Sequence, residues 1–333
     1  MRRRVPAAPA VMSLLVAALG AGAGPALAQP VKIKMGTSLS PPSSDVLTSY
    51  VAVERGFFSK YGLDVQVIQF RGGAINMKAL LAGEVDVSII GATDCIVSAS
   101  KGARIRTWMV PYPVVPFHFV ARKDAATTLQ ALVGKNIAVS GIGTISYHIP
   151  RIVLQRSGVD PEKVKYIALG SPADRFKALL AGKVDATLVT NIEAAKLAQH
   201  PEIIDLVQVS KVVPEIPYEF GLAKEDYIEK NPETIYGLTR ALLEAGRWIA
   251  ANKAGAVDVA MKVLKEEPPE ILGRAYDLAD PRHWGVNGDM TEAAYHYTVD
   301  FLLKVGYLKD PVPFEKFFDR RFVDRALKEL GRM

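Results

Sequence analysis

Short apolar runs and helix-forming segments alternate along the chain in a regular order. β-Favouring runs at residues 65–70 and 164–169 are each followed by a segment rich in helix formers, at residues 75–82 and 173–181. A glycine then ends each predicted helix, and a second apolar run follows it. Strand, helix and strand in this order predict βαβ units, which form parallel sheets.

The two βαβ units are copies of each other. Lys78–Asp86 recurs as Lys177–Asp185 at an offset of 99 residues, and eight of the nine positions are identical. A further apolar strand and an amphipathic helix precede each copy, with the strands at residues 31–35 and 136–140. Two copies are too few for a repeat array, so the duplication predicts two related α/β lobes.

Two stretches without a helical pattern are candidates for the connections between these lobes. Residues 108–120 and 207–220 are rich in proline and in β-branched or aromatic residues, which favours extended crossovers. From Lys224 onward the pattern is mainly helical, and we expect these helices to pack on the first lobe. The predicted boundaries are residues 29–114 with 216–333 for lobe 1, and residues 115–215 for lobe 2.

The N-terminal segment has the pattern of an export signal. Arg2–Arg4 form a basic start, Val11–Leu19 is a short apolar run, and Ala26–Ala28 offers a small-x-small cleavage site. The apolar run is about half of the roughly 20 residues that span a membrane, which argues against an anchor. The sequence thus predicts a cleaved signal peptide at residues 1–28. Its three arginines are half of the formal net charge of +6, so the remaining charge is mild and we expect no nucleic-acid partner.

Composition and cysteine usage describe an ordinary exported globular protein. The chain is 49% hydrophobic and 23% charged, and about 300 residues are enough for two cores. Cys95 is the single cysteine, so an internal disulfide is impossible, and it lies far from the leader, which excludes a lipid-anchored N-terminal cysteine. We expect a soluble monomer whose stability comes from core burial, with Cys95 inert and half-buried.

The ends of the predicted strands are the candidate binding site. In open parallel α/β sheets, ligands bind outside the carboxyl ends of strands, where helix N-termini offer unpaired N–H groups. Four such ends occur at equivalent places in the two halves, and they line one cleft if the lobes face each other. They are residues 37–40, 91–94, 141–147 and 190–193. Each Ser, Thr or Asp there can equally be a helix cap.

Several other chemistries find little support. Gly141-Ile142-Gly143 lacks the third glycine of a dinucleotide site, because Ser146 stands in its place. The five histidines form no close metal-ligand pair, so we expect no metal and no cofactor. His118 and His148 lie near the predicted cleft edges, where a ligand hydrogen bond and a structural role both stay open.

One repeated pair of carboxylates suggests catalysis at first sight. Asp86 and Asp185 occupy equivalent positions in the two copies. Both precede the starts of strands, away from the carboxyl ends where ligands bind, so a structural role is the better interpretation.

Two local motifs then identify a family resemblance. Residues 50–65, YVAVERGFFSKYGLDV, read with residues 80–87, LLAGEVDV, resemble the nitrate/sulfonate/taurine and thiamine-precursor-like group of ABC-transporter solute-binding proteins. The second half also fits, in residues 132–139 and 181–186. The resemblance covers about residues 30–250, and its motifs occur in family order.

The resemblance implies a type II periplasmic-binding-protein fold, in which two α/β lobes joined by two extended crossovers close around one solute. By position, the residues that match the family's cleft-lining loops are Ser38, Leu39, Thr93, Thr144, Ser146, Tyr147 and Asn191. Two further candidates come from residue chemistry. Arg71 can reach an acid group, although it can equally be a solvated turn residue, and Tyr112 with Tyr147 would suit a planar ring.

These observations predict a periplasmic receptor of an ABC importer. It would capture a small anionic organic solute, such as a sulfonate or carboxylate, and deliver it to an inner-membrane permease with a cytoplasmic ATPase. An exported enzyme on the same fold is the alternative, but the sequence shows no nucleophile–base pair or metal cluster. A ligand-sensing subunit without transport is a second alternative, which the sequence does not separate from a transport receptor.

Overall fold

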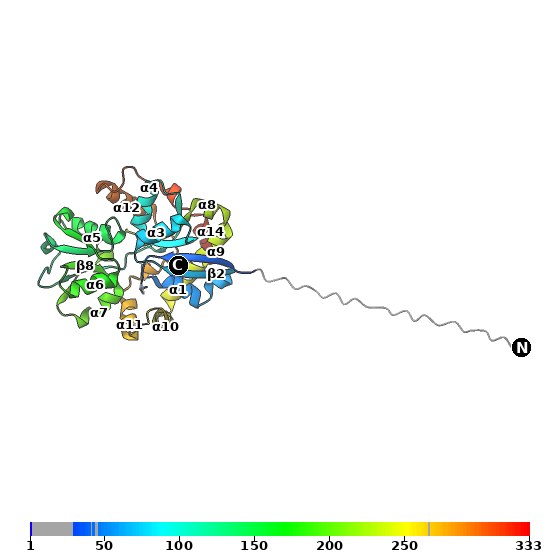
Figure 1. The fold of residues 1–333 in the computed structure, drawn as a ribbon, viewed down its shortest axis with the longest axis horizontal. Helices are drawn as coiled ribbons and strands as arrows, with labels where there is room; N and C mark the ends of the chain where they lie inside the picture. The colour runs from blue at the N-terminus through cyan, green and yellow to red at the C-terminus, as the bar shows by residue number, and fades with distance from the viewer. Residues whose placement is uncertain (2–28, 41, 44–45, 266) are drawn as a thin grey trace.

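The protein is built on two five-stranded mixed sheets, each covered by helices (Figure 1). The computed structural model describes residues 1, 29–40, 42–43, 46–265 and 267–333, so the predicted signal peptide lies outside the described residues except for Met1. The sheets have the strand orders β2-β1-β3-β10-β4, which we call lobe 1, and β7-β6-β8-β5-β9, which we call lobe 2. This confirms the predicted pair of α/β lobes.

The strands of lobe 1 are β1 (Val31–Thr37), β2 (Leu63–Gln69), β3 (Val87–Gly91), β4 (Ile105–Tyr112) and β10 (Glu219–Lys224). Those of lobe 2 are β5 (His118–Arg122), β6 (Asn136–Val139), β7 (Lys165–Ala168), β8 (Ala186–Val189) and β9 (Ile203–Gln208). The helices before the second crossover are α1 (Leu47–Glu54), α2 (Phe57–Lys60), α3 (Gly73–Ala82), α4 (Ala92–Ser100), α5 (Ile145–Arg156), α6 (Pro172–Leu180) and α7 (Asn191–Lys196). The C-terminal helices are α8 (Glu225–Lys230), α9 (Pro232–Ala251), α10 (Lys253–Val263), α11 (Pro269–Leu278), α12 (Glu292–Lys304), α13 (Phe314–Phe317) and α14 (Arg321–Leu330).

The sequence repeat forms the parallel centre of each sheet. β1 pairs in parallel with β2 and β3, and β6 pairs in parallel with β7 and β8. The repeated aspartates connect the strands of each centre. Asp86 Oδ2 accepts a hydrogen bond from the Lys34 N–H at 2.8 Å, and Asp185 Oδ2 accepts one from the Asn136 N–H at 2.9 Å. Their predicted structural role is therefore confirmed, and it is the same in both lobes.

The two crossovers exchange a strand between the lobes. After the first crossover, β5 lies antiparallel between β8 and β9 of lobe 2. After the second, β10 lies antiparallel between β3 and β4 of lobe 1. The stretches predicted as crossovers, residues 108–120 and 207–220, thus begin in the edge strands β4 and β9 and end in the interior strands β5 and β10. The sheets are therefore mixed rather than purely parallel. Each connection therefore leaves the sheet of one lobe and continues directly into a strand of the other lobe.

The C-terminal helices cover both lobes. α9 packs on α1, α2 and α14 at lobe 1, as the sequence predicts. α11 differs, because it packs against α7 of lobe 2. Gln208 Nε2 donates to the Leu278 carbonyl at 3.1 Å, and Lys196 pairs with Glu267 at 2.5 Å, so polar contacts also join this segment to lobe 2. Among the described residues, no helix has the length and apolar character of a membrane span.

The first crossover depends on a close backbone approach at Gly285, directly after the 3-10 turn η6 (Pro281–Trp284). Gly285 has φ +57°, and a Cβ there would lie 2.2 Å from the Pro111 carbonyl oxygen. A neighbouring contact, from His283 Nδ1 to the Val114 carbonyl at 2.7 Å, joins the same turn to the crossover. Only glycine combines this conformation with this approach.

We therefore predict that Gly285→Ala lowers the free energy of unfolding by at least about 2 kcal/mol, because it adds backbone strain and a clash with backbone. Gly273→Ala is the matched control. Gly273 lies inside α11, and a Cβ there meets no atom within 4 Å, so the change should be neutral or stabilise by up to about 1 kcal/mol. Urea unfolding followed by circular dichroism measures both. Equal free energies for Gly285→Ala and the wild type would contradict the prediction.

Candidate functional site

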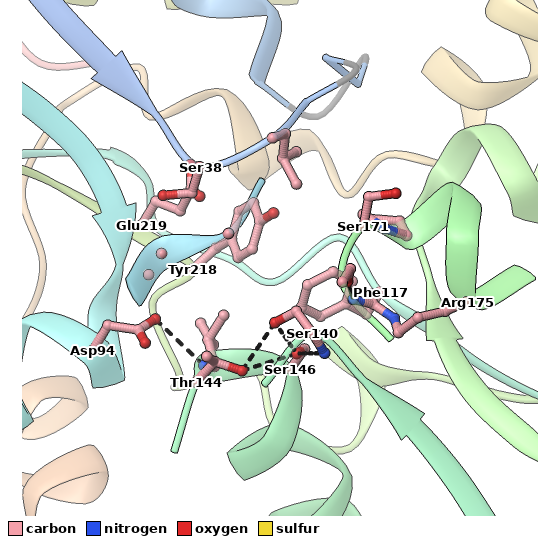
Figure 2. A pocket seen from close by; sticks show the side chains of 17 residues that line it. Ser38, Asp94, Phe117, Ser140, Thr144, Ser146, Ser171, Arg175, Tyr218 and Glu219 are labelled. Atoms are coloured by element: carbon pink, nitrogen blue, oxygen red, sulfur yellow. Dashed lines mark hydrogen bonds between the residues drawn. The ribbon is translucent and has the colours of Figure 1, made fainter. Parts of the chain in front are cut away.

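A cavity of about 40 Å³ lies between the lobes, and we call it the inter-lobe cavity. Residues of lobe 1 and of the second crossover form one wall: Ser38, Leu39, Gly72, Gly73, Gly91, Asp94, Tyr218 and Glu219. Residues of lobe 2 and of the first crossover form the other: Phe117, Ser140, Thr144, Ile145, Ser146, Gly170, Ser171, Pro172 and Arg175. Three of the four predicted strand ends, at residues 37–40, 91–94 and 141–147, contribute to this lining (Figure 2), whereas residues 190–193 do not.

Three hydroxyl groups form a cluster at the N-terminus of α5. Ser140 Oγ lies 2.6 Å from Ser146 Oγ and 3.0 Å from Thr144 Oγ1, and the latter two lie 3.0 Å apart. Thr144 also donates to the Gly141 carbonyl at 2.7 Å, and Ser146 accepts the Ser140 N–H at 2.8 Å. A hydroxyl carries one proton, so the cluster has one donor left once Thr144 and one serine have donated within the protein. The cluster can therefore offer a hydrogen bond to an acceptor in the cavity.

Ser38, on the opposite wall, is held in place by a buried amide. Asn76 Nδ2 donates to Ser38 Oγ at 3.2 Å and to the Ile89 carbonyl at 3.1 Å, and Ser38 Oγ itself donates to the same carbonyl at 3.1 Å. Position 36 in β1 must be glycine to leave room for the Asn76 amide, because a Cβ on Gly36 would lie 2.2 Å from Asn76 Oδ1. The network fixes the end of β1 at the cavity.

Arg175 is the main positive charge in the cavity wall. Its side chain is fully buried, with the residue 2% exposed, and it donates to the Gly170 carbonyl at 2.9 Å and the Leu188 carbonyl at 3.1 Å. Its Nε has no hydrogen-bond partner within the described residues, and its guanidinium forms no ion pair there. Burial lowers the pKa of Arg175 to about 10, so the group still carries its charge at neutral pH.

Two carboxyl groups lie on the facing wall, one of them half-buried and the other buried. Asp94, on the first turn of α4, accepts a hydrogen bond from the Ile145 N–H at 3.4 Å, which connects the two lobes. Burial raises the pKa of Asp94 from its usual 3.8 to about 7, so near neutral pH a large fraction of this group is protonated and can donate a hydrogen bond. Glu219, the first residue of β10, is 2% exposed. Figure 2 shows both on the side of Ser38, and Arg175 on the side of Ser171 and Phe117.

Of the nine candidate residues, four line this cavity: Ser38, Leu39, Thr144 and Ser146. The other five are not part of its lining. Arg71 forms an ion pair with Asp174 at 2.7 Å that crosses from lobe 1 to lobe 2. The side chain of Arg71 is 66% exposed, so the pair is a surface contact between the lobes and contributes at most about 1 kcal/mol.

The remaining four candidates are buried in the lobes. The Tyr112 hydroxyl accepts the Thr48 N–H at 3.1 Å, and its ring stacks on His283 at 5.2 Å between centroids, so burial raises its pKa. Tyr147 packs edge-on against Tyr166, with centroids 4.9 Å apart. Thr93 lies within α4, and Asn191 begins α7; they are 0% and 1% exposed.

The two histidines near the cleft edges have protein partners. His118 Nδ1 lies 2.6 Å from Asp205 Oδ2, and His148 Nε2 lies 3.1 Å from the Gly143 carbonyl. Burial lowers the pKa of His148 to about 3, so this ring is neutral. Neither lines the inter-lobe cavity. The part of the chain that the structure describes also contains no cluster of side chains suited to a metal ion.

The sequence did not single out Arg175, although the repeat contains a signal for it. Arg175 occupies the position in α6 that Asn76 occupies in α3, at the same offset of 99 residues. Asn76 supports the cavity wall through its hydrogen bond to Ser38, whereas Arg175 lines the cavity directly. Glu219 and Tyr218 come from the end of the second crossover, and only the fold brings them to the strand ends. Cys95 is fully buried rather than half-buried as the sequence predicts, and this burial raises the pKa of its thiol.

Comparison with known proteins gives consistent results. The family described as NMT1/THI5 like matches residues 43–256, which is more than half of the chain. A putative binding protein of Brucella abortus (strain 2308) is 26% identical over 275 residues, covering 79% of this chain and 82% of that protein. The taurine-binding periplasmic protein of Escherichia coli (strain K12) is 25% identical over 240 residues, covering 72% of each.

A solved structure shares the fold. The alkanesulfonate-binding protein SsuA from Xanthomonas axonopodis pv. citri bound to MOPS superposes with a TM-score of 0.75 at 19% identity, covering 88% of this chain and 99% of that one. This likeness confirms the predicted type II periplasmic-binding-protein fold, and the relatives confirm the resemblance that the sequence motifs indicate. The chain belongs to the NMT1/THI5-like family.

Proposed function

We propose that this protein is a periplasmic solute-binding receptor of an ABC importer. It captures a small organic anion between its lobes and presents it to an inner-membrane permease with a cytoplasmic ATPase, after its signal peptide has been removed, and it works as a monomer. Family membership and the binding proteins among its relatives support the receptor role. The charge of the solute is argued from the cavity itself.

The observation that carries the proposal is the buried guanidinium of Arg175. A buried charge whose hydrogen-bond partners are only carbonyl oxygens is costly, because the carboxylates of Glu193 and Asp174 attract it without forming an ion pair that would offset its removal from water. An oxyanion bound beside it, in the cavity that Arg175 lines, would supply a directly paired opposite charge. Hydrogen bonds to charged groups contribute about 1.5–3 kcal/mol each.

The other polar groups of the cavity fit the same solute. The hydroxyl cluster of Ser140, Thr144 and Ser146 has a donor available on the Arg175 side. On the opposite wall, Asp94 can donate when it is protonated. Because the donors belong to both lobes, the closed arrangement is the one in which all of them reach the solute, and binding therefore shifts the lobes toward closure.

The same geometry argues against the enzyme alternative. The serines of the hydroxyl cluster would need a general base to act as nucleophiles. The three hydroxyls hydrogen-bond one another and the backbone of Ser140 and Gly141, so within the described residues none of them is paired with a histidine or a carboxyl group. A role as a sensor without transport would use the same binding site, so the binding experiments below do not depend on that distinction.

We predict that Arg175→Gln weakens anion binding about 10- to 100-fold, because it removes the charge-assisted hydrogen bonds. Isothermal titration with a panel of sulfonates, carboxylates and nitrate measures this. Arg151→Gln is the matched control: Arg151 is also buried, but it pairs with Glu162 and lies over the Tyr147 ring, outside the cavity lining. An unchanged dissociation constant in Arg175→Gln, or a panel without any binding, would contradict the proposal.

We also predict that affinity for a sulfonate falls severalfold as pH rises from about 5.5 to 8.5. The sulfonate keeps its charge throughout, whereas Asp94 changes from a hydrogen-bond donor to an anion as pH passes its pKa of about 7. Asp94→Asn should flatten this profile.

The same shift affects stability. The folded-state pKa of Asp94 lies above its usual 3.8, so the stabilisation is complete below about pH 4 and is lost as pH rises through about 7. Unfolding of the wild type and Asp94→Asn across this window measures the loss. In the binding experiment, a wild-type affinity that varies with pH in the same way as the affinity of Asp94→Asn would contradict the role of Asp94 as a hydrogen-bond donor to the solute.

A further inference from the structure

A second cavity of about 250 Å³ lies next to the inter-lobe cavity, and we call it the outer cavity. The two are adjacent because Ser171 and Pro172 line both. These residues stand at the start of α6, so the helix that carries Arg175 in the first cavity also forms part of the wall of the second. A molecule bound to Arg175 has this cavity beside it.

The outer cavity presents an apolar surface to whatever occupies it. Its apolar lining consists of Pro42, Pro172, Ala173, Ile192, Val263 and Leu264. The polar side chains in the same wall are those of Ser43, Ser171, Glu193, Lys265 and Glu267; Lys265 is exposed, and the other four contact protein groups. Glu193 Oε2 accepts the Thr190 N–H at 3.1 Å, Ser43 Oγ donates to Thr190 Oγ1 at 3.3 Å, and Glu267 pairs with Lys196.

The two volumes indicate what fits in each cavity. An apolar cavity of about 150 Å³ is large enough to bind benzene. The inter-lobe cavity, at about 40 Å³, is far smaller and takes a head group but no ring. The outer cavity, at about 250 Å³, exceeds the benzene-sized volume. The volumes thus assign a small head group to the inter-lobe cavity and a larger apolar body to the outer cavity.

We propose that the solute is an amphiphilic organic acid, with its oxyanion at Arg175 in the inter-lobe cavity and a ring-sized or branched apolar body in the outer cavity. This deepens the proposed receptor function and rests on it. The class it names is that of aryl or branched-alkyl sulfonates and carboxylates, as opposed to inorganic anions or short-chain acids, which would leave the outer cavity unused.

The outer cavity is lined by segments of both lobes, so an apolar body bound there would favour closure of the lobes. Pro42 follows β1 in lobe 1, Pro172 and Ile192 belong to lobe 2, and Leu264 follows α10 in the C-terminal region. An apolar body in contact with all three segments buries its surface only when the lobes are together. Burial of the apolar body therefore stabilises the closed state further, in addition to the hydrogen bonds of the head group.

The test compares two sulfonates that share a head group, methanesulfonate and benzenesulfonate, by isothermal titration of the full mature protein. We expect benzenesulfonate to bind at least tenfold more tightly. Val263→Trp, which fills the outer cavity, should abolish this preference and leave methanesulfonate binding unchanged. Met261→Trp is the matched control, because Met261 is on the same helix, 41% exposed and not part of the lining.

Ile192→Ala provides a second variant in case Val263→Trp does not fold, and it should weaken benzenesulfonate binding alone. Equal affinity for the two sulfonates would overturn the amphiphile proposal while the receptor function stands. A benzenesulfonate preference that survives in both Val263→Trp and Ile192→Ala would also overturn it, because the ring would then lie elsewhere. If neither sulfonate binds and the wider anion panel also fails, the proposed function falls with it.

Discussion

The architecture of the site depends on one buried charge, the guanidinium of Arg175. Two backbone carbonyls, those of Gly170 and Leu188, hold it at the carboxyl ends of the lobe 2 strands, and within the described residues it has no carboxylate partner. Carbonyl dipoles orient a buried cation without neutralising it, and the carboxylates of Glu193 and Asp174 attract it without forming an ion pair, so the folded protein keeps an attraction for an anion between its lobes. Stability alone would favour an apolar residue at this position, which makes a binding role the simplest reason for the charge.

The facing wall limits which anions satisfy that attraction. Asp94 and Glu219 place carboxyl groups opposite Arg175, and burial keeps the pKa of Asp94 near neutrality. A protonated Asp94 donates to an anion, whereas an ionised one repels it. The contacts between the lobes, including the Asp94–Ile145 hydrogen bond and the exposed Arg71–Asp174 pair, are individually weak. Because the direct contacts are weak, closure depends on the solute, whose hydrogen bonds to both walls contribute much of the free energy of closing.

The sequence predicted the parts of this structure that depend on local pattern. The 99-residue repeat identified both lobes, and the place of Asp86 and Asp185 before their strands predicted their structural role. It also located strand ends, and Ser38 and Thr144, which it places there, line the inter-lobe cavity. Arg175 was missed because a charged residue inside an amphipathic helix has the pattern of a solvated face, and only tertiary packing shows that it is buried. Tyr112 shows the reverse, since its aromatic character suited a ligand but its ring is enclosed by the fold.

A crystal structure of the mature protein with benzenesulfonate tests the central claim most directly. The account predicts sulfonate oxygens within hydrogen-bond distance, about 2.7–3.2 Å, of the Arg175 guanidinium and of the hydroxyl cluster, with the ring against Pro172 and Leu264 in the outer cavity. A sulfonate bound away from Arg175, or an Arg175 side chain that turns toward a protein carboxylate while the solute binds elsewhere, would contradict it.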